Sequence, residues 1–462
     1  MTNELTLVLG LGESGLAMAR WLARQGVPLR VADSRETPPG IDRLRELAPA
    51  AEIVTGPFTD ALLDGVGRIA ISPGLDPRQP LMQAARARGI PVTGEMEIFV
   101  EALRSLGVRE QTQVIAITGT NGKTTTTTLA GEMVCAAGLD GVVAGNISPA
   151  TLDVLMARLD AGAALPQVWV LELSSFQLET RPVLEAVSAT VLNVTDDHLD
   201  RYAGLDDYAA AKAEVFQGDG VQVLNRQDVR VAAMARPGRR IYTFGVDAPA
   251  GSDDFGVVRG NDGEWLARGA DRLLRRAEMP LAGSHNVANA LAALALCEAA
   301  GLPRAPLLAA LKAFRGLPHR VEKVAERSDG VVYYDDSKGT NVGATVAALE
   351  GLRRKVVLIA GGDGKGQDFS PLKEAFAHHA RAVVLIGRDA KTIEAAVAGC
   401  GVPLVPAADM DAAVLEANAR AEAGDVVLLS PACASLDMFR NYAHRAQVFI
   451  DAVKRLPGVS PA

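Results

Sequence analysis

The chain has 462 residues, of which 48% are hydrophobic and 22% are charged, and this length favours about three domains over one. The composition is typical of a soluble α/β protein and excludes disordered and fibrous classes. A net charge of −8 and a pI near 5.4 argue against nucleic acid and anionic membranes as partners. The four cysteines have no CxxC spacing, which predicts reduced thiols in a cytoplasmic protein rather than disulfides or a zinc site.

The N-terminal sequence, MTNELTLVLGLG, fits a strand that enters a glycine loop better than a signal sequence, because it carries a glutamate and no basic cluster. No apolar stretch approaches the roughly 20 residues that span a bilayer. We therefore expect a cytoplasmic protein without a membrane partner. A monomer is a separate expectation.

Short β-branched runs alternate with Ala- and Leu-rich stretches along most of the chain, a pattern typical of parallel sheets with crossover helices. The expected strands are 6–9, 29–32, 69–72, 114–118, 168–173, 189–194, 356–360, 382–386 and 426–430. The segment 239–268 interrupts this rhythm and predicts an antiparallel hairpin around Asn261-Asp262-Gly263.

Two further interruptions predict domain boundaries. The polar stretch 107–113 precedes a strand, and Arg315-Gly316-Leu317-Pro318 breaks a helical run. The expected fold class is α/β with three domains, at 1–107, 108–316 and 317–462.

The first glycine loop, Gly10-Leu11-Gly12-Glu13-Ser14-Gly15, follows a predicted strand and opens a helix, with Asp33 at the end of the next strand. This pattern matches the dinucleotide fingerprint, in which backbone amides approach a pyrophosphate at a helix N-terminus. Taken alone it favours an NAD-dependent dehydrogenase, although the same geometry serves any diphosphate-linked nucleoside. Ser72-Pro73-Gly74 ends a later strand and is either a second polar lip of this site or a simple turn.

The second loop, Gly119-Thr120-Asn121-Gly122-Lys123-Thr124, lies between a predicted strand and a helix expected over 125–137. Its amides suit phosphates, Lys123 suits the charge of the β- and γ-phosphates, and Thr124 offers a hydroxyl to Mg²⁺. Ile117 stands where the GxxxxGK[ST] pattern has its first glycine, so the loop is a shorter variant. We predict that it binds ATP with Mg²⁺.

Glu172 and His198 both follow predicted strands, at the edge where open α/β sheets place their ligands. Mg²⁺ prefers oxygen, so Glu172 and Thr124 are natural ligands and a histidine is a less usual one. The alternatives are an N-cap or surface carboxylate for Glu172, and for His198 a histidine paired with the neighbouring acids.

Six motifs resemble the Mur ligases of peptidoglycan synthesis: Gly119–Thr124, Glu172–Gln177, Asp197-His198, His285–Asn289, His319-Arg320 and Asp336-Ser337-Lys338. Within that family, segments 361–365 and 430–435 resemble the members that add D-glutamate to UDP-N-acetylmuramoyl-L-alanine. The resemblance covers nearly the whole chain, and it is the ordered combination of motifs that is specific.

The resemblance implies a Rossmann-like UDP-binding domain, a central ATPase domain and a Rossmann-like third domain that closes over the nucleotide and binds the amino acid. It assigns the first glycine loop to a UDP-sugar. The implied contacts are Ser14, Ser72 and Asn146 at the diphosphate, and Asp33, Ser34 and Arg35 around the uracil.

In the same way the resemblance implies that Lys212 is a carbamylated lysine that bridges metal ions beside Glu172 and His198. From the sequence alone, Lys212 is an ordinary lysine on a helix surface. The other implied residues are Asn286 and Asn289 at adenine, Arg320 and Asp336 at phosphate and ribose, and Lys338, Thr340, Lys365, Ser435, Leu436 and Tyr442 at glutamate. Helix capping is the plain alternative for the two asparagines.

The activity implied is an ATP-dependent amide ligation through an acyl phosphate, with Lys123, His198 and Lys212 in catalytic roles. Three alternatives stay open: a folylpolyglutamate synthase, which would not need the first domain; a dehydrogenase, which leaves Gly119–Thr124 unexplained; and a non-catalytic ATP-binding scaffold. No motif reports the configuration of the glutamate.

Overall fold

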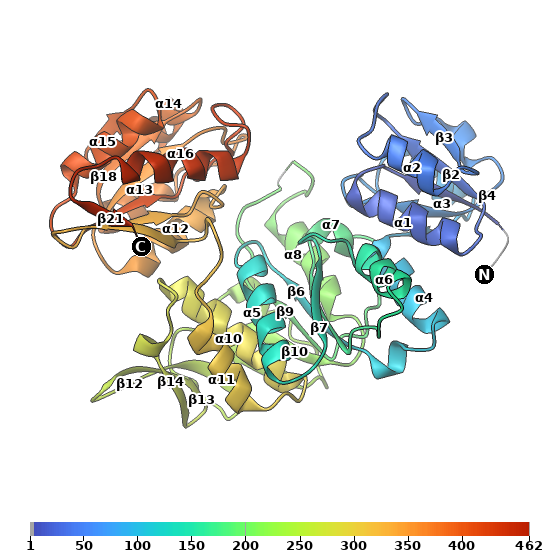
Figure 1. The fold of residues 1–462 in the computed structure, drawn as a ribbon, viewed down its shortest axis with the longest axis horizontal. Helices are drawn as coiled ribbons and strands as arrows, with labels where there is room; N and C mark the ends of the chain where they lie inside the picture. Colours follow the sequence, from blue (N-terminus) through green and yellow to red (C-terminus); the bar gives the residue numbers. More distant parts are fainter. Residues whose placement is uncertain (1–3, 199, 462) are drawn as a thin grey trace.

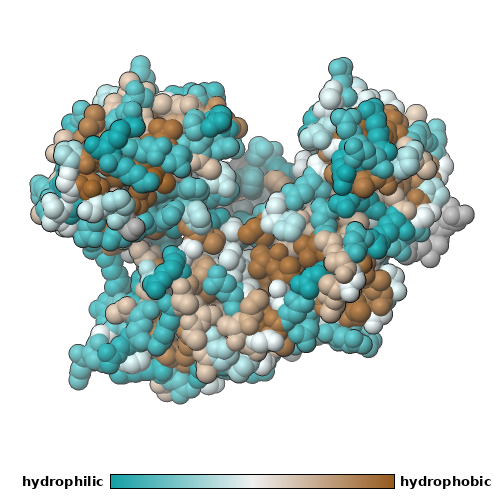
Figure 2. All heavy atoms as spheres, viewed as in Figure 1, coloured by the Kyte–Doolittle hydropathy of each residue, from teal (hydrophilic) through white to brown (hydrophobic). Residues whose placement is uncertain are grey.

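The computed structural model describes residues 4–198 and 200–461, and these form three sheets, each from one consecutive stretch of chain. In Figure 1 the first lobe is blue, the middle lobe runs from cyan to yellow, and the third is orange to red. The first and third lobes stand on the same side of the middle one, and Figure 2 shows a recess between them. Within the described residues, no helix is long and apolar enough to cross a membrane.

The first sheet is parallel, in the order β3-β2-β1-β4-β5. Its strand order reverses beside β1, so the loop that follows β1 lies at the switch point where such sheets bind ligands. Its elements are β1 (Leu5–Leu9), α1 (Glu13–Arg24), β2 (Leu29–Asp33), α2 (Ile41–Leu47), β3 (Glu52–Thr55), β4 (Val66–Ile71), α3 (Pro80–Ala87), β5 (Val92–Thr93) and α4 (Glu95–Ser105).

The second sheet has the order β14-β13-β12-β11-β10-β9-β6-β8-β7 and places the buried strand β6 between β9 and β8. Its strands are β6 (Gln113–Thr118), β7 (Gly141–Gly145), β8 (Val168–Glu172), β9 (Ser188–Val191), β10 (Val221–Asn225), β11 (Ile241–Phe244), β12 (Asp254–Gly260), β13 (Gly263–Arg268) and β14 (Asp271–Arg275). Its helices are α5 (Lys123–Ala136), α6 (Thr151–Asp160), α7 (Ser175–Leu178), α8 (Leu205–Ala213), α9 (Val229–Ala232), α10 (Ser284–Ala299) and α11 (Arg304–Ala313).

The third sheet has the order β19-β18-β17-β20-β16-β15-β21, in which β15 runs antiparallel to both of its neighbours. Its strands are β15 (Glu322–Arg327), β16 (Val332–Asp335), β17 (Val356–Gly361), β18 (Ala380–Ile386), β19 (Leu404–Pro406), β20 (Val426–Leu429) and β21 (Val459–Pro461). Its helices are α12 (Val342–Leu352), α13 (Leu372–His379), α14 (Ala390–Ala396), α15 (Met410–Arg420) and α16 (Tyr442–Lys454).

Apolar packing joins the first two lobes, whereas the buried clusters of the third lobe contain residues of that lobe alone. One buried cluster contains residues of both, and within it Phe99 of α4 meets Trp169 of β8 edge-on, with ring centroids 4.7 Å apart. The buried residues of the third lobe form clusters of their own. The first two lobes therefore share a core.

All nine predicted strands are present, and the predicted hairpin is the antiparallel pair β12–β13. Among the limits that differ, one strand end and one helix start bear on the site. The strand expected to reach residue 194 ends at Val191, so Asn193 to His198 lie in a loop beyond it. The helix expected from residue 125 begins at Lys123, because Gly122 turns the chain with a φ of +84°. The three domain ranges remain a proposal, and their limits fall between the sheets.

Candidate active site

The loop Gly119–Thr124 joins the buried strand β6 to α5 at the carboxyl edge of the second sheet. Gly119 and Gly122 have φ values of +147° and +84°, which other residues rarely adopt. A Cβ on Gly122 would lie 2.3 Å from Oδ1 of Asn289, and one on Gly119 would lie 2.9 Å from Cβ of Leu192. Both glycines are therefore needed for the path of this loop.

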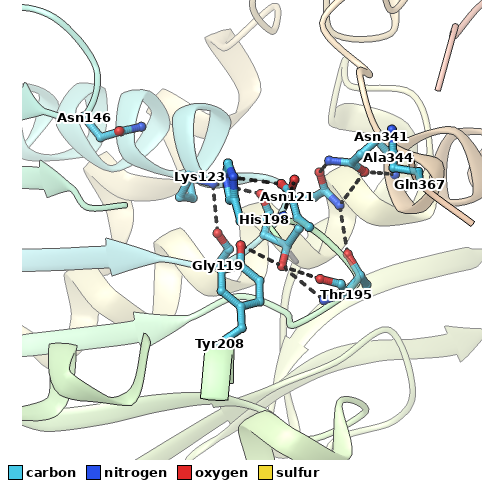
Figure 3. A network of polar contacts seen from close by, with 12 residues as sticks. Gly119, Asn121, Lys123, Asn146, Thr195, His198, Tyr208, Asn341, Ala344 and Gln367 are labelled. Atoms are coloured by element: carbon cyan, nitrogen blue, oxygen red, sulfur yellow. Dashed lines mark hydrogen bonds and ion pairs between the residues drawn. The ribbon is translucent and has the colours of Figure 1, made fainter. Parts of the chain in front are cut away.

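Lys123 folds back onto its own loop, as Figure 3 shows. Its Nζ donates to the carbonyl oxygens of Gly119 at 2.9 Å and Thr120 at 2.8 Å. Burial lowers the pKa of Lys123, and the nearby carboxylates of Glu172 and Asp197 oppose this only in part. The ammonium group is thus held at the centre of the loop, where phosphates would contact it.

The segment after β9 clamps the phosphate loop. The Asn193 side chain accepts from the Asn121 amide at 2.8 Å and donates to the Asn121 carbonyl at 3.0 Å. The Thr120 amide donates to the Asn193 carbonyl at 2.9 Å, and the Thr195 amide donates to the Thr120 hydroxyl at 3.1 Å. The loop is therefore pre-shaped by a segment from a neighbouring strand.

Glu172 is the last residue of β8 and only 3% exposed, so it is not a surface carboxylate. It is not an N-cap either, because Ser174 caps α7. Asn146 Nδ2 donates to Glu172 Oε1 at 2.8 Å, whereas Oε2 is buried and has no hydrogen-bond partner among the described residues. A buried carboxylate oxygen that lacks a partner matches the preference of Mg²⁺ for oxygen ligands.

Lys212 lies on α8 and is 1% exposed, so the surface position expected from the sequence alone is wrong. Its Nζ donates to the Gly119 carbonyl at 2.9 Å and lies 4.3 Å from the centroid of the Tyr208 ring. Burial, with the positive charge of Lys123, holds the pKa of Lys212 well below its ordinary value. An uncharged amine, which this shift favours, is the form that reacts with carbon dioxide.

His198 lies in the loop after β9 with a φ of +54°, and its side chain is 43% exposed. Its ring centroid is 4.7 Å from that of Phe176, and its Nε2 is 3.7 Å from Oδ2 of Asp197. Burial lowers the pKa of His198, against the pull of Asp197. The lowered pKa favours the neutral imidazole, which is the form that can accept a proton or bind a metal.

The third domain reaches the phosphate loop through Arg320, whose Nη2 donates to Thr124 Oγ1 at 2.7 Å. Behind it, the Ser430 hydroxyl donates to Asp336 Oδ2 at 2.7 Å, and burial raises the pKa of Asp336 to about 7. Lys338 places its Nζ 3.9 Å from the centroid of the Tyr442 ring. Cationic side chains of one domain therefore face the phosphate loop of another.

A cavity of about 780 Å³ lies between the middle and third domains. It brings together these residues predicted for the site: Thr120, Asn121, Gly122, Lys123, Thr124, Asn146, Glu172, Arg320, Lys338, Thr340 and Tyr442. Lys212 lies beneath the loop instead. Ser435 is buried, whereas Lys365 and Leu436 are exposed. Among the described residues, these three are not part of the cavity lining.

Asn286 and Asn289 lie in the first turns of α10 without capping it, because Gly283 holds the N-cap position. Asn286 donates to the Ala282 carbonyl at 2.7 Å, and Asn289 donates to Asn286 Oδ1 at 3.3 Å. Since Asn289 also packs against Gly122, the pair supports the phosphate loop from behind.

Of the residues predicted for a UDP-sugar, Asn146 lines this cavity, whereas the others lie in or beside the first glycine loop. Asp33 accepts from the Leu11 amide at 2.7 Å and pairs with Arg35, which lowers the pKa of Asp33 to about 2. The Ser72 hydroxyl donates to the Gly10 carbonyl at 3.2 Å. Ser14 is the second residue of α1, and Ser34 directly follows β2. The amide of Asn146, expected at the diphosphate, is held by Glu172.

Sequence reasoning missed three residues that shape the cavity. Asn193 and Thr195 hold the phosphate loop from the same loop after β9 that carries His198. Asn341 lines the cavity and donates to Asn121, which lies 220 positions earlier in the sequence. No local sequence pattern indicates a contact between residues so far apart along the chain. The signal for Asn193 was present, because polar residues after a parallel strand lie at the ligand edge of the sheet.

Three models of Mur ligase domains match the chain in order. The MurD-like N-terminal domain matches residues 4–94, the middle domain matches 117–297, and the glutamate ligase domain matches 319–433. The UDP-N-acetylmuramoylalanine–D-glutamate ligase of Aromatoleum aromaticum is 66% identical over 99% of both chains. The enzyme of the same name from Dechloromonas aromatica is 58% identical, again over 99% of both chains.

Solved structures with the same fold include a pseudomurein peptide ligase type C from Methanothermus fervidus. It is 18% identical with a TM-score of 0.59, covering 97% of this chain and 99% of that one. The UDP-N-acetylmuramate-alanine ligase MurC from Thermotoga maritima is 20% identical with a TM-score of 0.55, covering 98% and 99%. Together with the high identity to the two curated relatives, the fold and the matched domains show that the chain belongs to the Mur ligase family.

Proposed function

We propose that the chain uses ATP to join the amine of D-glutamate to the L-alanyl carboxylate of UDP-N-acetylmuramoyl-L-alanine. The observation that carries this proposal is the cavity between the middle and third domains, where a phosphate loop faces Arg320 and Lys338. A ligase that activates one carboxylate and captures a dicarboxylate amino acid needs such a concentration of positive charge. The names of the curated relatives supply the identity of the two substrates.

In the first step, the γ-phosphoryl group of ATP passes to an oxygen of the alanyl carboxylate, which yields ADP and an acyl phosphate. Lys123, held by two loop carbonyls, would offset the charge that spreads over the phosphoryl oxygens during transfer. Arg320 would leave Thr124 and add a second cationic contact from the third domain.

Glu172, Thr124, His198 and a carbamylated Lys212 would hold Mg²⁺. Two observations support Mg²⁺ at this place. Oε2 of Glu172 is buried and has no hydrogen-bond partner among the described residues, and the amine of Lys212 is buried beside the loop. When bound, Mg²⁺ would neutralise phosphate charge. Asn146 would keep the Glu172 carboxylate oriented through its hydrogen bond at 2.8 Å.

In the second step, the glutamate amine attacks the acyl carbon, the bond to the phosphate oxygen breaks, and inorganic phosphate leaves as the amine loses a proton. Lys338 and Thr340 line the same cavity and would hold the glutamate carboxylates. Lys365, Ser435 and Leu436 would join them only if the third domain or its loops moved. Closure of the two domains would exclude water, which would otherwise hydrolyse the acyl phosphate.

The test is phosphate release from ATP in the presence of UDP-N-acetylmuramoyl-L-alanine and either D- or L-glutamate. We expect release only with the D enantiomer and only with both substrates. Lys123→Ala should abolish it, whereas Lys312→Ala, an exposed lysine on α11 that pairs with Glu278, should not. Release without the UDP substrate, or equal release with L-glutamate, would contradict the proposal. Release with a folate substrate, or NAD reduction, would favour the alternatives.

A further inference from the structure

The N-terminus of α12 lies against the phosphate loop. Asn341 Nδ2 donates to Asn121 Oδ1 at 3.2 Å, and Asn121 Nδ2 lies 3.4 Å from Asn341 Oδ1. Figure 3 shows the two amides facing each other from different domains. The same Asn341 oxygen accepts from the Ala344 amide at 2.8 Å, so that Asn341 is also the N-cap of α12.

Gly343, the second residue of α12, makes this close approach possible. A Cβ at this position would lie 2.9 Å from Oγ1 and 3.3 Å from Cβ of Thr195, and 3.4 Å from Nδ2 of Asn121. Its backbone is helical, so it needs no unusual φ. Glycine is a poor helix former, so helix propensity does not explain its presence here. Its missing side chain instead allows the helix to lie close to the middle domain.

The contact continues into the loops of the third domain. The Val342 amide donates to Gln367 Oε1 at 3.1 Å, and Gln367 Nε2 donates to the carbonyls of Gly364 at 2.9 Å and Ala432 at 3.2 Å. Gly364 directly precedes Lys365, and Ala432 lies in the segment that ends at Ser435. The start of α12 therefore links the phosphate loop to both loops assigned to glutamate.

We propose that Asn341 and Gly343 are positioning residues that dock the amino-acid half of the site onto the phosphate loop. Docking makes the phosphate loop, α12 and the two glutamate loops one unit, so that the amine meets the activated carboxylate in a fixed geometry. The inference rests on the proposed function for the identity of the amino acid. The docking itself is a contact between two domains and is measurable without any substrate.

Two variants separate docking from helix stability. Asn341→Ser keeps an N-cap, because serine caps helices as well as asparagine does, but its side chain is too short to reach Asn121. Gly343→Leu leaves the cap intact and fills the space beside Thr195. The matched control is Asp409→Ser, which changes the N-cap of α15 in the same domain, at a residue outside the described cavity lining.

The first measurement is a distance between the domains by pulsed electron paramagnetic resonance. Cys135 on α5 is exposed, whereas Cys297, Cys400 and Cys433 are buried, so Cys135 and an added Leu415→Cys on α15 can carry the two spin labels. We expect a narrow distribution in the parent protein and in Asp409→Ser. In Asn341→Ser and Gly343→Leu it should broaden and extend to longer distances.

The second measurement is kinetic. The apparent KM for D-glutamate should rise about tenfold in both variants, because the amino-acid site is complete only in the docked population. The Kd for UDP-N-acetylmuramoyl-L-alanine should not change, since the residues proposed to bind it lie in the first and middle domains. Unchanged distances in both variants, or changed distances with an unchanged KM, would overturn the inference. A parent protein that releases no phosphate would refute the proposed function instead, and the distances would still decide whether these residues dock the domains.

Discussion

Lys212 makes one hydrogen bond within the described residues, to the Gly119 carbonyl, although it lies beneath a loop suited to phosphates. A buried amine with no acidic partner there contributes little as a cation, but a carbamate on the same nitrogen would offer two oxygens to a metal. Lys212→Ala should therefore lower phosphate release by about 100-fold. Formate or propionate should restore part of it, because either anion can bring carboxylate oxygens into the emptied space in place of those of the carbamate. Lys212→Arg, which fills the space and cannot form this carbamate, should not recover. Full activity in Lys212→Ala would show that the carbamate assignment is wrong.

Asp336 gives the third domain a pH-dependent component of stability. Burial raises the pKa of this carboxyl from 3.8 to about 7, and the Ser430 hydroxyl and Arg320 offset this only in part. Between these values the folded state binds more protons than the unfolded state, so stability falls as the pH rises from about 4 to 7. Asp336→Asn removes this component, and its urea midpoint relative to the parent protein should be higher at pH 7 than at pH 5. A difference that is the same at both pH values would contradict this assignment.

At the scale of elements, local chemistry was enough to predict β6, the phosphate loop and α5. Glycines, a lysine and a threonine stand at a strand-to-helix junction, and the interactions that these residues signal are with residues close by in the sequence. The end of β9 was mispredicted for a tertiary reason. Leu192 and Val194 are apolar and buried, and this pattern is typical of a strand. In the structure, however, this segment lies beyond the sheet, where Asn193 binds the phosphate loop.

The sequence could not predict which polar side chains of the site are buried. Helix α8 has the sequence LDDYAAAKA, in which one lysine among alanines resembles a surface residue. Only the packing of α8 beneath Gly119 turns Lys212 inward. The pairing of Asn341 with Asn121 is equally hidden, because it joins two neutral amides 220 positions apart. Family resemblance named Lys212, and tertiary structure explains its environment.

At the scale of the whole molecule, the first and middle domains are joined by a polar contact beside their shared core. Glu95, the first residue of α4, accepts from the amide of Thr151 at 2.8 Å and from its hydroxyl at 2.6 Å. Thr151 is the first residue of α6, and burial raises the pKa of the Glu95 carboxyl. The third domain has separate apolar clusters, so we expect it to unfold as its own unit.

Glu95→Ala should lower the stability of the unit formed by the first two domains by about 1–3 kcal/mol, because it leaves the buried Thr151 amide without an acceptor. Glu95→Gln keeps an acceptor oxygen and should retain most of that stability. Differential scanning calorimetry should therefore show the transition of this unit moving down in Glu95→Ala while that of the third domain stays in place. Glu101→Ala, which removes a more exposed carboxylate of the same helix paired with Arg68, is the control and should shift neither. If both transitions moved together in Glu95→Ala, the third domain would not unfold as a separate unit, because its stability would then depend on the contact between the other two.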